Sequence, residues 1–120
     1  YAWIPVGLVL LAFAALGRVP ESAGLHALTI GSMGGLIVGM ITRTALGHTG
    51  RMLAAGRPET AMYVLVQLAV ILRLAPVLFG GLPWMAFVTA AALCWSACFA
   101  IYVVTYGPRL MAPRLDGRPG

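Results

Sequence analysis

Two histidines are the side chains in this sequence best suited to bind a metal or a haem iron. His26 and His48 stand near the two ends of one apolar, glycine-rich segment, HALTIGSMGGLIVGMITRTALGHTGR. A neutral imidazole is a common metal ligand, although a histidine at a helix end also often bonds a nearby carbonyl or caps the helix. At about 1.5 Å of rise per helical residue the two side chains lie roughly 30 Å apart. One metal ion therefore cannot bind both within a single copy, and any metal or haem site needs ligands from elsewhere.

Arg73 and Arg43 are permanent positive charges inside apolar runs. Arginine does not lose its proton, so each needs a carboxylate, a phosphate, a carbonyl or water, or it must extend to the lipid headgroups. The acidic residues all lie at expected helix boundaries or in the tail. For Arg73 the open interpretations are a partner from another segment, an anionic ligand such as a haem propionate, and snorkelling. Arg43 is expected to snorkel, although the surrounding TRTALGHTGR could bind an anion.

Cys94 and Cys98 are four residues apart and so share one helix face. Two thiolates can bind copper(I), and Met33, Met40 and Met85 could add thioether ligands. Ordinary packing is the commoner role of buried cysteine and methionine. Because both cysteines lie inside an apolar run, they do not indicate a disulfide framework.

The sequence lacks the residue patterns that several classes of enzyme need. The sequence contains no nucleophile–base pair, carboxylate dyad, phosphate-binding glycine loop or HExxH spacing, which disfavours hydrolysis and phosphoryl transfer. It has no basic patch with interleaved aromatic residues, so we expect no nucleic-acid partner. No residue can be assigned a catalytic role from these patterns.

The composition indicates an integral membrane protein. Hydrophobic residues make up 61% of the chain, charged residues only 9%, and the mean hydropathy is +0.94, values far from those of soluble domains. We expect an all-α fold, a polytopic transmembrane helix bundle with four membrane spans. The chain begins with Tyr1 and without a signal-peptide leader, so we also expect it to be a piece of a longer protein. The expected elements are a truncated first helix over 1–17, spans over 23–47, 59–79 and 84–106, a basic loop over 48–58 and a tail over 107–120.

The span over 23–47 carries small residues at a spacing of four. Ala27, Gly31, Gly35 and Gly39 follow one register, and Gly34 widens the stripe. Small residues let membrane helices approach closely, so we expect this helix to be central in the bundle. The alternative is that glycine is simply commoner in membrane helices.

The distribution of arginines predicts the orientation. The loop over 48–58 and the tail should be cytoplasmic, because cytoplasmic segments carry an excess of positive charge. Both ends of the chain then lie on the cytoplasmic side. The arginines of the loop and tail are Arg51, Arg57, Arg109, Arg114 and Arg118, against Arg18 alone in the opposite turns.

Three phrases in this sequence resemble the NnrS family. HALTIGSMGG, MITRTALGHTGR and the tail PRLDGRPG occur in this order and at spacings compatible with a membrane. NnrS proteins are bacterial inner-membrane proteins associated with nitric oxide and denitrification. The resemblance covers almost the whole chain, which is similar to only the C-terminal portion of a family member.

The resemblance implies a protein that contains haem and copper and protects against nitrosative stress. His26 corresponds to the histidine of the HALT phrase, and His48 to that of the LGHTGR phrase, which Arg43 precedes. These residues are expected to contact a cofactor. Arg73 belongs to none of the three phrases, and under the haem hypothesis it would compensate the charge of a propionate. Since the chain has at most one candidate ligand at each membrane face, the expected partners are the bilayer, the preceding helices of the same protein and a small gaseous or anionic ligand.

Three functions remain open at this point. The first is a haem-linked role in nitric oxide metabolism. The second is transport or efflux of an anion or a metal–nitrosyl species along Arg43 and Arg73. The third is a purely structural helix bundle.

Overall fold

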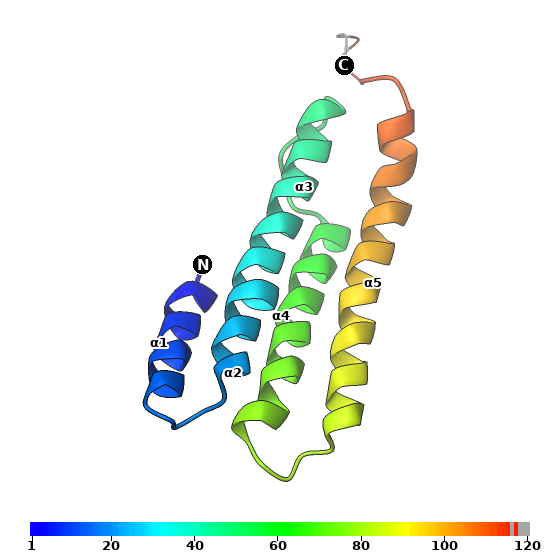
Figure 1. Ribbon diagram of the computed structural model, residues 1–120. Coiled ribbons are helices and arrows are strands. Elements are labelled where there is room, and N and C mark those ends of the chain that lie inside the picture. The colour runs from blue at the N-terminus through cyan, green and yellow to red at the C-terminus, as the bar shows by residue number, and fades with distance from the viewer. Residues whose placement is uncertain (116, 118–120) are drawn as a thin grey trace.

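The described part of the protein is a bundle of helices without strands. The computed structural model describes residues 1–115 and 117. Figure 1 shows the helices side by side and alternating in direction, which confirms the predicted all-α helix bundle. In chain order they are α1 (Trp3–Ala15), the continuous run of α2 (Glu21–His26), the π-helix η1 (Ala27–Gly34) and α3 (Gly35–His48), then α4 (Arg57–Leu78) and α5 (Trp84–Met111).

Three of these helices are long and apolar enough to cross a membrane, namely Glu21–His48, Arg57–Leu78 and Trp84–Met111. The fourth, α1, has 13 residues and is therefore about 20 Å long, short of the roughly 30 Å of a hydrocarbon core. This is the helix that was predicted from the sequence to be truncated. Large apolar side chains cover the outer faces of the bundle and are more than 40% exposed, among them Val64, Leu68, Ile71, Leu93, Val103 and Val104. Faces of this kind suit contact with lipid.

The helix ends differ in detail from the expected bounds. The second span begins at Glu21 because Pro20, in an extended conformation, precedes the first helical turn. The last helix continues through Pro108 to Met111, so residues 107–111 are helical and do not belong to the extended tail. Contacts of Tyr106 and Arg109 with α4, described below, hold these last turns. Asp116 and Arg118, which the tail was expected to include, lie outside the described residues.

Helix α4 links two apolar clusters along the bundle axis. One cluster joins Val38 and Leu46 of α3 to Met62 and Val66 of α4 and to Cys98 of α5. The other joins Ala23 and Ala27 to Val70 and Leu74. Since the side chains of α4 enter both clusters, this helix lies between the α2–η1–α3 run and α5 (Figure 1).

Two glycines of η1 allow tryptophans to pack against the backbone. A Cβ atom on Gly31 would lie 2.5 Å from Cγ of Trp3, and one on Gly34 would lie 2.8 Å from Cζ3 of Trp95. The two glycines therefore contact different helices, α1 and α5. A Cβ on Gly35 or Gly39 would meet no atom closer than 3.9 Å. The expected single stripe of small residues is thus divided, because the π-helical turns change the register between the two glycines.

Trp3 also fixes α1 to the bundle by a hydrogen bond. The indole N–H of Trp3 donates to Oε1 of Gln67 on α4 at 2.7 Å. A buried or lipid-facing amide needs such a partner, since the hydrocarbon offers none. Trp3 therefore joins α1 to both η1 and α4.

Candidate functional site

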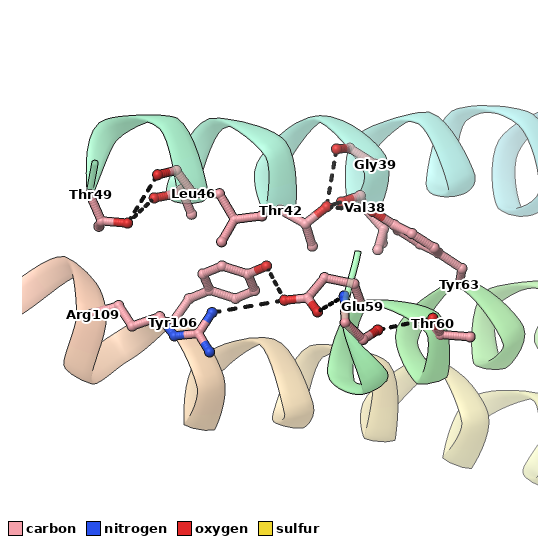
Figure 2. Close-up of polar contacts among 12 residues, drawn as sticks. Val38, Gly39, Thr42, Leu46, Thr49, Glu59, Thr60, Tyr63, Tyr106 and Arg109 are labelled. Carbon is pink, nitrogen blue, oxygen red and sulfur yellow. Dashed lines mark hydrogen bonds and ion pairs between the residues drawn. The ribbon is translucent and has the colours of Figure 1, made fainter. Parts of the chain in front are cut away.

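A carboxylate network connects the first turn of α4 to the last turns of α5. Glu59 is only 4% exposed. Its Oε2 accepts the backbone N–H of Gly56 at 2.8 Å, which caps the start of α4. Its Oε1 accepts the hydroxyl of Tyr106 at 2.5 Å and lies 3.8 Å from Nη1 of Arg109 (Figure 2). Both carboxylate oxygens are therefore satisfied by groups from two helices.

Aromatic contacts complete this network. The guanidinium of Arg109 lies over the ring of Tyr106, 5.2 Å from its centroid. The rings of Tyr102 and Tyr106 stack at 4.9 Å. Sequence reasoning placed Glu59 at a helix boundary and did not find this network. The available signal was a glutamate three residues after Gly56 together with a tyrosine and an arginine three apart on the last helix.

A polar cavity of about 360 Å³ adjoins the carboxylate. It is lined in part by Thr42 and Arg43 of α3 and by Glu59 and Tyr63 of α4. The hydroxyl of Thr42 donates to the carbonyl of Val38 at 2.8 Å, so the Tyr63 hydroxyl, 2.9 Å away, donates to Thr42. Figure 2 shows these two side chains facing each other between α3 and α4. A cavity with a carboxylate, two hydroxyls and a guanidinium can hold water or a small polar ligand.

Arg43 and His48 line a second cavity at the same end of the bundle. This cavity measures about 490 Å³ and also includes Thr44 and Arg114. Both Arg43 and His48 are exposed. The structure thus brings together these two predicted site residues, and the guanidinium and imidazole give the cavity a composition suited to an anion.

His26 lies at the other end of the α2–η1–α3 run. Its side chain is half-buried, and its Nδ1 lies 2.5 Å from the carbonyl oxygen of Ser22. Because a carbonyl only accepts, Nδ1 donates and the lone pair of Nε2 is left for another partner. Metal-binding histidines are commonly held in this way. His26 and His48 are separated by roughly 30 Å of helix, and the structure does not bring them together.

Arg73 stacks on Trp84 near the turn between α4 and α5. Its guanidinium carbon lies 4.9 Å from the centroid of the Trp84 ring. Its Nη1 is buried and has no hydrogen-bond partner among the described residues. From the sequence, this arginine was expected to need an anionic partner or to snorkel. Arg73 and Trp84 come into contact because α4 packs against α5. Their spacing in the sequence does not predict this contact.

The cysteines and methionines considered as copper ligands differ in burial. Cys98 is fully buried in the apolar core and Cys94 is half-buried, while Met33, Met40 and Met85 are each more than half exposed. Within the described ranges no three His, Cys, Asp or Glu side chains gather so that they could hold a metal ion. Methionine is not among these four residue types, so the copper site considered for Cys94 and Cys98 stays a prediction.

Comparison with known proteins gives one match. The family model described as "NnrS protein" matches residues 1–114, nearly the whole chain. No curated protein matches the chain, and no solved structure matches it.

Proposed function

The chain belongs to the NnrS family, and we propose that it supplies a haem ligand, His26, to a protein of the bacterial inner membrane that acts on or senses nitric oxide. Family membership and the three long apolar helices establish a membrane protein with a role related to NnrS in the nitric oxide response. The cofactor, its ligand and the location in the bacterial inner membrane are the proposed parts.

The arrangement of His26 is the observation that carries this proposal. The Nδ1–H of the neutral imidazole donates to the Ser22 carbonyl, which leaves the lone pair of Nε2 as the group that could bind iron. Among the described residues, His26 would hold the iron of a haem through its imidazole. Bound haem would supply an iron atom able to bind nitric oxide. The remaining ligands would come from other helices of the same protein.

His48 is the proposed alternative ligand position. It is exposed, lies in the cavity with Arg43 and is separated from His26 by the length of the helix. An iron held at His48 would therefore lie at the opposite membrane face from an iron held at His26. We derive no role for copper.

The proposed orientation places the loop over 49–56 in the cytoplasm. This loop and the C-terminal end lie at the same end of the bundle (Figure 1), where the backbone N–H of Leu115 donates to the carbonyl of Thr49 at 3.4 Å. Four described arginines lie in this loop, at the start of α4 or near the C-terminal end: Arg51, Arg57, Arg109 and Arg114. An excess of arginine of this kind favours the cytoplasmic side.

Absorption spectra of the complete protein in membranes test the haem proposal. We expect a Soret band that His26→Ala abolishes or shifts and that His48→Ala leaves unchanged. Loss of the band in His48→Ala but not in His26→Ala would instead favour the alternative ligand position at the other end of the same helix. A wild-type protein without a Soret band, or a His26→Ala spectrum identical to the wild type, would contradict the proposal.

A second candidate function is anion transport, and the position of Arg43 favours it. This arginine lines both the 360 Å³ cavity beside Glu59 and the 490 Å³ cavity beside His48. An anion that enters the 490 Å³ cavity would therefore contact the same guanidinium that lines the 360 Å³ cavity. Flux of nitrite in liposomes that is lost in Arg43→Gln and kept in Arg57→Gln would support transport, and equal flux in both variants would exclude this role for Arg43.

A further inference from the structure

We infer that Arg73 and the cavity beside it form a binding site for one anionic glycerophospholipid, with the lipid phosphate on the guanidinium and an acyl chain in the cavity. This inference is independent of the haem proposal, which rests on His26.

The guanidinium of Arg73 lies at the depth of lipid headgroups. Its backbone is inside α4, but its guanidinium carbon lies 4.9 Å from the ring centroid of Trp84, the first residue of α5. The side chain therefore extends toward the turn over 79–83. Tryptophan is enriched at the membrane–water interface, and phosphates of phospholipids lie at the same level.

The Arg73 guanidinium keeps a donor that has no partner in the described part of the chain. Its carbon lies over the Trp84 ring in a cation–π contact, and oxyanions bind a guanidinium through its N–H groups. Nη1 is buried without a hydrogen-bond partner in the described part of the chain. A buried N–H donor without an acceptor costs free energy, and an oxyanion from outside the chain removes that cost.

The cavity next to Arg73 has the composition of an acyl-chain site. It measures about 400 Å³ and lies between η1, α4 and α5. Arg73 and Ser96 are its only polar lining residues, and the others are Ile30, Ala69, Val88, Ala91, Ala92 and Trp95. Ala92 and Ser96 are exposed, so the cavity opens on the outer face of the bundle, where lipid lies.

The wall formed by Trp95 is held by close packing. A Cβ on Gly34 would lie 2.8 Å from the Trp95 ring, and this ring also packs against Phe99 with centroids 5.1 Å apart. The cavity is thus bounded by a fixed indole on one side and by small alanines on another. One cation at the headgroup level and an apolar cavity open to the bilayer together match an amphiphile with one anionic group.

A free inorganic anion fits this site less well than a lipid. Inorganic phosphate would meet one guanidinium and otherwise apolar walls, which cannot replace its water. A zwitterionic lipid carries its own ammonium near the phosphate, which reduces the attraction of Arg73. The site therefore favours a lipid with net negative charge, such as phosphatidylglycerol.

Lipid retention tests the inference directly. The complete protein is reconstituted in nanodiscs of equal parts phosphatidylglycerol and phosphatidylcholine and then extracted in mild detergent, and the bound lipids are counted by native mass spectrometry. We expect retained phosphatidylglycerol in the wild type, about a tenfold loss of this preference in Arg73→Gln and a smaller loss in Arg73→Lys. Arg57→Gln, which removes an exposed arginine from the other end of α4, should keep the wild-type preference.

Two further measurements separate the alternatives. Ala92→Phe narrows the apolar cavity without changing charge and should also reduce retention. The thermal unfolding temperature in phosphatidylcholine discs should be equal for the wild type and Arg73→Gln. A loss of lipid retention in this variant is then not caused by a loss of folding. A wild type that retains both lipids equally, an Arg73→Gln variant with the wild-type preference, or displacement of the lipid by inorganic phosphate would each overturn the inference.

Discussion

The hydroxyl of Tyr106 donates a hydrogen bond to Oε1 of Glu59 at 2.5 Å, across 47 positions of sequence. This bond links the last turns of α5 to the first turn of α4, and it joins a fully buried Tyr106 to an almost fully buried Glu59. The two helices also pack closely along their length (Figure 1). The polar contact therefore fixes the register in which the two apolar surfaces meet.

The first prediction concerns this bond. Tyr106→Phe should lower the free energy of unfolding by about 1–3 kcal/mol, because it leaves a buried carboxylate oxygen with one donor fewer. Unfolding in mixed micelles measures the change. Tyr102→Phe is the matched control, since it removes a neighbouring hydroxyl that is outside the network, and it should have little effect. Equal losses in both variants would contradict this role of Tyr106.

A second prediction concerns the carboxylate itself. Glu59→Ala should destabilise the protein more than Tyr106→Phe does, because it removes the acceptor of the Gly56 N–H as well as the partner of Tyr106 and Arg109. Glu59→Gln keeps an acceptor for Gly56 and should have an intermediate effect. The same unfolding measurement ranks the three variants. An alanine variant as stable as the wild type would show that the network contributes nothing.

The third prediction compares two glycines of the same helix run. Gly31→Ala should cost about 1–3 kcal/mol of stability, because its Cβ would lie 2.5 Å from the Trp3 ring and must displace it. Gly39→Ala has open space around its Cβ and should be neutral or stabilising by up to about 1 kcal/mol. Thermal unfolding and the fluorescence of Trp3 report on both. The opposite ranking would show that α1 does not pack as described.

The fourth prediction tests the orientation in the membrane. In a variant with Cys94 and Cys98 replaced by alanine, a cysteine introduced at Ala55 should react with an impermeant reagent only from the cytoplasmic side. A cysteine introduced at Gly80, in the turn at the other end of the bundle, should react only from the opposite side. Labelling of intact and opened cells measures both. Reaction of both positions from one side would contradict the proposed arrangement.

The sequence was sufficient to predict the class of fold and the approximate position of each long helix. Apolar runs of sufficient length, ended by glycine, proline and arginine, determine these features almost alone. The separation of His26 from His48 likewise follows from helix rise, and the proximity of Arg43 to His48 follows from their spacing.

Pairings between distant residues could not be predicted in the same way. The bond between Tyr106 and Glu59 and the stacking of Arg73 on Trp84 depend on how α4 and α5 are rotated about their own axes. Nearly uniform hydrophobicity around these helices leaves that rotation undetermined, since no polar face marks the outside. The π-helix was not predicted either, because a change in backbone hydrogen-bond register has no distinct composition.

The eight-residue π-helix after His26 has a consequence for how α2 is oriented. Each π-type hydrogen bond encloses one residue more than an α-type bond, and one residue corresponds to a rotation of about 100° around the helix axis. Winding the same residues as a regular α-helix would therefore turn the imidazole of His26 by about 100° relative to α3, and deleting one residue between Ala27 and Gly34 would offset that turn. The direction in which this imidazole points is thus governed by the winding of a neighbouring segment and not by the histidine's own place in the chain.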